Sequence, residues 1–235
     1  MTARAQPSGR KIRGAALRSV EAAALAGLAH AALSLVSTYL LLRAPRPSAG
    51  TVDVIWYTDE ANQRSTVLGL NLMAIGTIAF LWFVAVIRRR VGERENRFFG
   101  TVFLGSALLL AATRIIAGIL LAAPAMSAYA FDLPPDANSI GLWQAAGLSM
   151  ATIVGTRLEA VFVFSTTTVG RLSGALPAWL VGLGYLAGLA LLAAPLPRTL
   201  LIWLFPVWIS LVSASLLVRH RLLDAESAPP ATPSP

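Results

Sequence analysis

The sequence predicts an all-α membrane protein, a bundle of six transmembrane helices with both termini in the cytoplasm. The chain has 235 residues, of which 56% are hydrophobic and only 13% are charged, whereas soluble domains contain about 25% charged residues. Six apolar stretches each approach or exceed the roughly 20 residues that a helix needs to cross a bilayer. The basic residues are distributed unevenly between the segments that connect these stretches, which predicts the orientation.

The predicted architecture is one membrane domain, residues 20–218, between two polar tails. Residues 1–19 contain five basic residues and no acid, and form a basic cytoplasmic tail. Residues 219–235 are polar and rich in proline, and are expected to be a disordered cytoplasmic tail. The six spans are expected at about 20–42, 66–87, 99–123, 142–169, 176–194 and 199–218.

The first apolar stretch is predicted to be a retained span and not a signal peptide. The run from Val20 to Leu42 is longer than the apolar region of a signal peptide, and the Arg-Ala-Pro-Arg-Pro that begins at Arg43 is a poor cleavage site. Its many alanines suit close helix packing in lipid.

The second and third spans are separated by an arginine-rich turn. Thr58, Asp59 and Glu60 are typical of a helix start, because acidic residues are favoured at the positive end of a helix. The second span ends at the three arginines that begin with Arg88. A loop with two acids and no base is expected after the third span, over residues 124–140.

The last three spans contain proline and glycine signals. Pro177 lies near the first turn of the fifth span, where its missing N–H is tolerated. Gly184 and Gly188 form a GxxxG pair, which suggests a packing face. Pro206, near the middle of the sixth span, is expected to kink that helix.

Orientation follows from counting lysine and arginine. With the N-terminus inside, the inner segments hold 13 basic residues and the outer segments hold 4, while Arg114 and Arg157 lie within spans. This difference predicts that both termini are cytoplasmic.

Residues 78–110, IAFLWFVAVIRRRVGERENRFFGTVFLGSALLL, resemble a widespread group of uncharacterised multi-pass membrane proteins from GC-rich bacteria. The segment LPAWLVGLGY at residues 176–185 is similar to theirs as well. The resemblance covers about a third of the chain and implies a shared bundle in the bacterial cell membrane. It implies no activity, substrate or catalytic residue.

Ionisable residues within the spans are the candidate functional groups. A charge in the middle of a bilayer costs about 2.5–3.5 kcal/mol on insertion scales, so these side chains should face protein or a wet cavity. Arg157 and Glu159 are two residues apart and therefore face different neighbours. We expect Glu159 to pair with Arg114 and Arg157 to reach toward Glu21. The candidate buried polar network comprises Glu21, His30, Asn71, Arg114, Arg157 and Glu159.

Two functions are compatible with this network. The buried charges can lock the helix order in a non-enzymatic structural or accessory partner of other membrane components, and this is the function that we expect. The alternative is a small-solute or proton-coupled transporter that uses Arg114, Arg157, Glu159 and His30, because a histidine can change its charge with pH. A solvent-accessible cavity that reaches Glu159 or His30 favours the transporter, and a dry, packed centre favours the accessory protein.

Other classes lack a sequence signal. No span contains an aspartate and the chain contains no cysteine, so no catalytic residue, metal site or cofactor is expected. A nucleic-acid partner is not expected either, because the arginines flank the spans. Expected partners are the lipid bilayer and other membrane proteins or a second copy of the chain. Candidate contacts with anionic lipids are Arg88, Arg89, Arg90, Arg94 and Arg97.

Overall fold

The computed structural model describes the backbone of residues 9–46, 53–91, 97–193 and 199–226. Within these ranges all regular structure is helical, in agreement with the predicted all-α class. The elements are α1 (Gly9–Leu42), α2 (Val54–Thr58), α3 (Glu60–Val91), α4 (Arg97–Phe131), α5 (Ala137–Ser149), the π-helix η1 (Met150–Gly155), α6 (Thr156–Leu172), α7 (Ala178–Ala193), the 3₁₀ helix η2 (Thr199–Trp203) and α8 (Leu204–Glu226).

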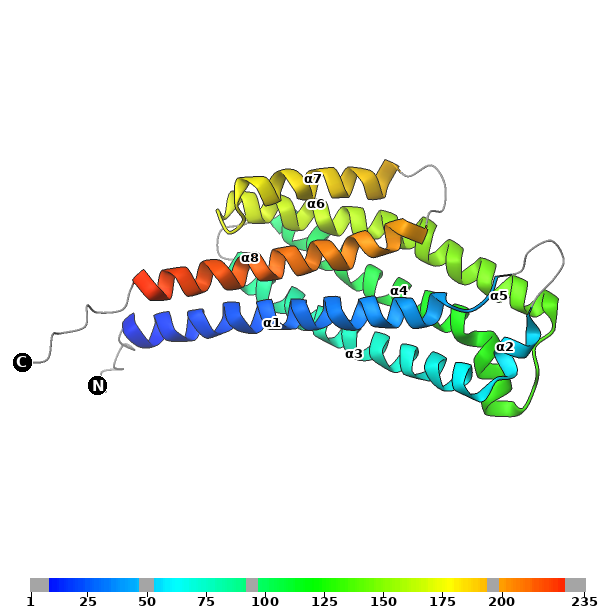
Figure 1. Ribbon diagram of the computed structural model, residues 1–235. Helices are drawn as coiled ribbons and strands as arrows, with labels where there is room; N and C mark the ends of the chain where they lie inside the picture. Colours follow the sequence, from blue (N-terminus) through cyan, green and yellow to red (C-terminus); the bar gives the residue numbers. More distant parts are fainter. Residues whose placement is uncertain (1–8, 47–52, 92–96, 194–198, 227–235) are drawn as a thin grey trace, which may run out of the picture.

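The long helices run roughly parallel or antiparallel in one elongated bundle (Figure 1). The start of α1 and the end of α8 lie side by side at one end, which we call the terminal end. The short helix α2 lies at the opposite end, the α2 end, together with the start of α5. Helix α1 packs mainly against α3 and α8, whereas α7 packs mainly against α6 at the edge of the bundle.

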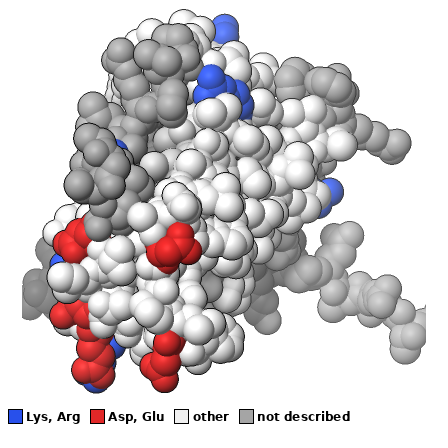
Figure 2. All heavy atoms as spheres, turned by 90° about the vertical axis from the view of Figure 1, so that its right-hand side faces the viewer, with Lys and Arg blue, Asp and Glu red and all other residues white. Residues whose placement is uncertain are grey.

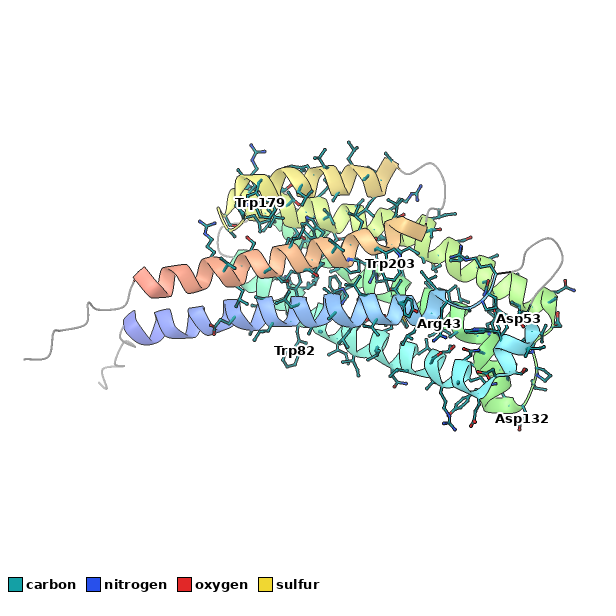
Figure 3. All side chains as sticks on the ribbon, viewed as in Figure 1. Arg43, Asp53, Trp82, Asp132, Trp179 and Trp203 are labelled. Carbon is teal, nitrogen blue, oxygen red and sulfur yellow. The ribbon has the colours of Figure 1, made fainter. Side chains whose placement is uncertain are left out.

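The helices have the composition of membrane spans. Five segments are long and apolar enough to cross a bilayer, namely Glu21–Leu42, Glu60–Arg88, Gly100–Phe131, Ala137–Leu172 and Leu201–Arg219. Helix α7 is apolar but has only 16 residues. Large apolar side chains also point away from the bundle, among them Trp82 and Trp179 (Figure 3), which are 69% and 61% exposed. Such an outer surface is suited to lipid contact.

The α2 end is acidic. Figure 2 looks onto this end and shows carboxylate side chains gathered over one part of it. Asp59 accepts a hydrogen bond from the backbone N–H of Asn62 at 2.9 Å, so α3 starts as the sequence predicts. The exposed acidic side chains at this end are Asp53, Asp59, Glu60, Asp132 and Asp136.

Several helices are longer than the sequence predicts. Helix α1 begins at Gly9 and α8 continues to Glu226, so both expected tails are partly helical. Alanine, leucine and arginine near these ends are strong helix formers, which explains the extension. Helix α4 continues through Pro124 to Phe131, and the expected loop after the third span is correspondingly short.

The expected position of Pro206 near the middle of an α-helix is wrong. The 3₁₀ helix η2 precedes α8, and Pro206 therefore lies in the first turn of α8 instead of in the middle of a helix. Backbone N–H groups in a first turn have no partner within the helix, so proline is tolerated there. Pro177, by contrast, immediately precedes α7 and its carbonyl accepts hydrogen bonds from Leu180 and Val181, as expected for a helix start.

The GxxxG pair is used for packing within the chain. A Cβ atom built on Gly184 would lie 2.2 Å from Oγ1 of Thr167, and one built on Gly188 would lie 2.8 Å from the ring of Phe164. Both neighbours belong to α6. The two glycines therefore let the backbone of α7 approach α6 closely.

A hydrogen-bonded group around Tyr57 connects three segments near the α2 end. Tyr57 is fully buried, and its hydroxyl donates to the carbonyl of Pro45 at 2.9 Å and accepts from Nε2 of Gln144 at 2.5 Å. The same nitrogen of Gln144 lies 3.0 Å from the Pro45 carbonyl. Burial raises the pKa of Tyr57 to about 12, so the hydroxyl keeps its proton at neutral pH. This group joins the segment that follows α1 to α2 and to the middle of α5.

We expect Tyr57→Phe to lower the free energy of unfolding in detergent by about 1–3 kcal/mol, because the buried Nε2 of Gln144 loses one of its two acceptors and the Pro45 carbonyl loses one of its two donors. Tyr39→Phe is the matched control, since Tyr39 is 61% exposed on the surface of α1, and should change stability by less than about 0.5 kcal/mol. Equal losses in the two variants would show that the group around Tyr57 does not hold this end together.

Candidate functional site

A buried ion pair joins α4 to α6 in the middle of the bundle. Nη2 of Arg114 lies 2.8 Å from Oε1 of Glu159, and Nε of Arg114 donates to the same oxygen at 3.2 Å. Glu159 is only 2% exposed. Two charges at this depth are stable only because each neutralises the other.

The π-helix η1 ends about one turn before Glu159 in the fourth span. Helices α5, η1 and α6 follow one another without a break, so this span is a single helical course with one widened turn. One additional residue in a turn rotates every following side chain by about 100°. The π-helix therefore sets the face on which Glu159 meets Arg114.

Arg157 makes hydrogen bonds to the widened turn formed by η1. Its Nη1 donates to the carbonyl of Thr152 at 3.1 Å and lies 3.1 Å from Oγ1 of Thr156. Both partners lie on the side of Arg157 that faces the α2 end. The π-turn thus offers Arg157 nearby acceptors on its own helix, and the expected reach of Arg157 toward Glu21 stays a prediction.

His30 and Ser34 of α1 face the ion pair. Nδ1 of His30 lies 2.8 Å from the carbonyl of Gly76 on α3, and only a protonated nitrogen can donate to that carbonyl. Oγ of Ser34 lies 3.4 Å from Nε2 of His30 and accepts from Nη1 of Arg114 at 3.4 Å. Polar contacts therefore connect α3, α1, α4 and α6 at one level of the bundle.

A cavity adjoins this polar level. Its volume is about 60 Å³, and His30, Ser34, Arg114 and Glu159 all line it. A space of this size holds on the order of four waters. From the ion pair the lining continues along α1 to Leu41 and Leu42 and along α4 to Leu121, and it is therefore directed toward the α2 end.

One carboxylate oxygen of Glu159 has no hydrogen-bond partner among the described residues. Oε1 accepts both bonds from Arg114, whereas Oε2 is buried and unbonded. A buried carboxylate oxygen without a partner costs several kcal/mol unless water or a ligand bonds to it. Because Glu159 lines the cavity, a water molecule or a ligand in the cavity can donate that hydrogen bond.

Four phenylalanine rings close the other side of the ion pair, and we call them the phenylalanine cluster. The ring of Phe162 lies 5.2 Å from those of Phe80 and Phe103 and 5.8 Å from that of Phe205. Phe162 follows Glu159 by almost one helical turn toward the terminal end. Phe205 also lies against Arg114, whose Cζ is 5.1 Å from the ring centre. The cluster separates the ion pair from the terminal end.

Two members of the expected polar network lie apart from this site. Asn71 is exposed on α3 and donates to the carbonyl of Val67 on its own helix at 2.8 Å. Glu21 is half-buried in the part of α1 nearer the terminal end and does not line the cavity. Asn71 was expected inward because asparagine is polar, but an i−4 carbonyl satisfies it without a second helix.

The arginine-rich turn is only partly visible. Arg88 is exposed at the end of the described part of α3, where it can reach lipid headgroups. Arg94 and the side chains of Arg89, Arg90 and Arg97 lie outside the described residues.

Of the polar side chains of α1 that line the cavity, His30 was expected from the sequence, whereas Ser34, Ser37 and Thr38 were not. His30, Ser34 and Thr38 recur at intervals of four residues, which places them on one face of a helix. That polar stripe in an apolar span was a usable signal. No signal in the sequence indicated the glycines Gly118 and Gly155, which complete the cavity wall.

In the described part of the chain, no group of three or more His, Cys, Asp or Glu side chains is arranged to hold a metal ion. No protein-family model, curated protein or solved structure matches the chain. The similarity of residues 78–110 to the bacterial membrane-protein group stays a prediction.

Proposed function

We propose that the chain is a six-span protein of the bacterial cytoplasmic membrane that carries a small polar solute through the cavity at Arg114 and Glu159. The observation that carries this proposal is the unbonded Oε2 of Glu159 beside a cavity. An ion pair that only locks helix order needs neither a free oxygen nor space beside it. A solute site needs both.

The closure of the site on one side supports a carrier in particular. The cavity is directed toward the α2 end, and the phenylalanine cluster covers the ion pair on the terminal side. Such an arrangement corresponds to one of the two states that a carrier alternates between, with the site reachable from a single side of the membrane. The second state would require the phenylalanine rings to separate.

The proposed topology puts the α2 end outside and both termini in the cytoplasm. The 13 basic residues of the inner segments and the 4 of the outer segments support this orientation, and the acids of the α2 end agree with it. Helix α7 is the fifth span in chain order and completes the six. Its 16 residues extend about 24 Å, so the bilayer must thin or the flanking residues must complete the crossing.

Thiol labelling tests the proposed carrier directly, because the chain contains no cysteine and single-cysteine variants need no other change. Thr38 lines the cavity on the outer side, and Thr166 is buried on α6 one turn beyond Phe162. We expect Thr38→Cys to react with a membrane-impermeant thiol reagent added outside intact cells. Thr166→Cys should react from the inner side in inverted vesicles, in the minority of molecules whose phenylalanine cluster is open.

The matched controls are Val36→Cys and Val161→Cys, which place a cysteine on the lipid-facing surface of the same two helices. If Thr38→Cys and Thr166→Cys are as unreactive as these controls from both sides, the carrier proposal fails. The buried charges then have the structural role of an accessory membrane protein. Reaction of Thr38→Cys from the inner side alone would reverse the proposed orientation.

A further inference from the structure

We infer that the cavity takes up one small monocarboxylate together with one proton, with the anion bound by Arg114 and the proton held by Glu159. This inference rests on the proposed carrier function and specifies its solute. It follows from three observations. The buried site must stay electrically neutral, Oε2 of Glu159 has no donor among the described residues, and the two donors of Arg114 that bond to Glu159 can instead bind a carboxylate.

The empty site is electrically neutral, because it contains one guanidinium and one carboxylate. An anion that enters while Glu159 is ionised leaves an uncompensated negative charge in an apolar environment, which is costly. A cation leaves an uncompensated positive charge at the same cost. An anion that arrives with one proton on Glu159 keeps the site neutral in both its empty and its loaded state.

Oε2 of Glu159 is the atom that can accept this proton. Among the described residues it has no donor, and the side chain lines the cavity, so water in the cavity can reach it. A lone pair of Oε2 takes a proton from a hydronium ion and leaves one water molecule. The carboxyl group is then neutral and holds the guanidinium of Arg114 less tightly.

Arg114 presents a suitable edge to an anion once Glu159 is neutral. Its Nε and Nη2 groups both donate to the single oxygen Oε1 in the empty site. These two parallel donors match the two oxygens of a carboxylate, which can bind in a bidentate arrangement. Release of the anion lets Glu159 return its proton to water and pair with Arg114 again.

Arg157 of α6 is charged, but it does not line the cavity and donates to the Thr152 carbonyl, so it is not counted in this balance. His30 of α1 lines the same cavity, and its Nδ1 is engaged by the carbonyl of Gly76. Helix α7 contributes Tyr185, whose hydroxyl lies 3.1 Å from Oγ1 of Thr168 and not at the cavity. In their described parts, neither η1 nor η2 contributes a titratable side chain.

The size and lining of the cavity limit the anion to a short organic acid. Its volume of about 60 Å³ is equivalent to roughly four waters, which corresponds to an acid of about four to six heavy atoms. Beyond the ion pair the lining includes Met73, Ala117, Leu121 and Ile202, which are apolar. A short carbon chain fits such a wall, whereas a strongly hydrated inorganic anion gains nothing from it.

The test uses full-length protein in liposomes, with glycolate as the probe and glycolamide as a neutral solute of the same size. We expect the protein to accelerate glycolate uptake, and an inside-alkaline pH gradient to increase the initial rate. A membrane potential set with potassium and valinomycin should leave that rate unchanged, because one anion and one proton move together. Protein-free liposomes correct for passive entry of the acid.

Two variants distinguish the role of Glu159 in binding the proton from the role of Arg114 in binding the anion. Glu159→Gln imitates the protonated carboxyl, so it should still exchange glycolate across the membrane but lose the stimulation by the pH gradient. The double variant Arg114→Gln with Glu159→Gln has no buried charge, and it should bind glycolate roughly ten- to a hundredfold more weakly than Glu159→Gln does.

A binding measurement on the unmodified protein covers the case in which the variants do not fold. Glycolate should raise the thermal unfolding temperature more at acidic than at alkaline pH, whereas any effect of glycolamide should not depend on pH. The inference is overturned if glycolate binds at neither pH, or if its uptake follows the potential and ignores the pH gradient. Transport of glycolamide without glycolate would also overturn it and leave the carrier proposal intact.

Discussion

Glu159→Gln is expected to lower the free energy of unfolding by about 3–5 kcal/mol, the largest effect of any single substitution considered. The variant leaves Arg114 buried without its carboxylate, and a guanidinium cannot lose its proton to escape that cost. The side chain of Arg114 is only 17% exposed, so the few waters that the cavity holds compensate only part of that cost. Unfolding in mixed detergent and sodium dodecyl sulfate, followed by circular dichroism, measures the change.

Two comparisons make this prediction specific. Adding Arg114→Gln to Glu159→Gln removes the unpaired charge, and should recover a large part of the lost stability. Glu60→Gln breaks the pair that Glu60 forms with Arg64, in which both side chains are at least 70% exposed, and should cost less than about 1 kcal/mol. A Glu159→Gln variant as stable as Glu60→Gln would show that the central pair does not stabilise the bundle. Glycolate should restore stability to Glu159→Gln and not to the double variant.

Gly184→Ala is expected to destabilise the protein by about 1–3 kcal/mol through overpacking. The added methyl group would lie 2.2 Å from Oγ1 and 3.0 Å from Cγ2 of Thr167. Thr167 is branched at Cβ and cannot move far within a helix, so α7 must shift away from α6. The same unfolding measurement in detergent reports the loss.

Gly182→Ala is the matched control on the same helix. A Cβ atom at Gly182 has nothing within 4 Å in the described structure, and alanine is favoured over glycine in a helix by up to about 1 kcal/mol. Gly182→Ala should therefore be neutral or stabilising. If Gly184→Ala behaves in the same way, the contact between α7 and α6 is looser than the structure indicates.

The all-helical fold could be predicted from the sequence because each long apolar segment has only one way to satisfy its backbone in lipid. The helix start near Glu60 and the position of Pro177 followed from local signals. The extension of α4 through Pro124 did not. In that case tertiary packing, with Ala122 and Ala125 both buried, outweighed the local preference of proline.

The sequence positions of the charged residues predicted the candidate site only in part. Two residues of separation correctly place Arg157 and Glu159 on different faces, but the π-helix η1 changes the face on which each of them lies. Such a turn has no sequence signature, so the contacts of Arg157 with Thr152 and Thr156 could not be predicted. The cavity depends on how α1, α3, α4 and α6 pack together, which no single segment specifies.

The most direct measurement concerns water next to the ion pair. Ala117 is 4% exposed and lines the cavity almost one turn beyond Arg114, whereas Ile119 faces lipid at a similar depth and is 54% exposed. We expect Ala117→Cys to react with an impermeant thiol reagent added outside, and Ile119→Cys not to react. We also expect Gly118→Leu, which pushes against Met73 in the cavity wall, to slow the reaction of Ala117→Cys. An Ala117→Cys variant as inert as Ile119→Cys would mean that Glu159 lies in a dry core, which contradicts the proposed solute site.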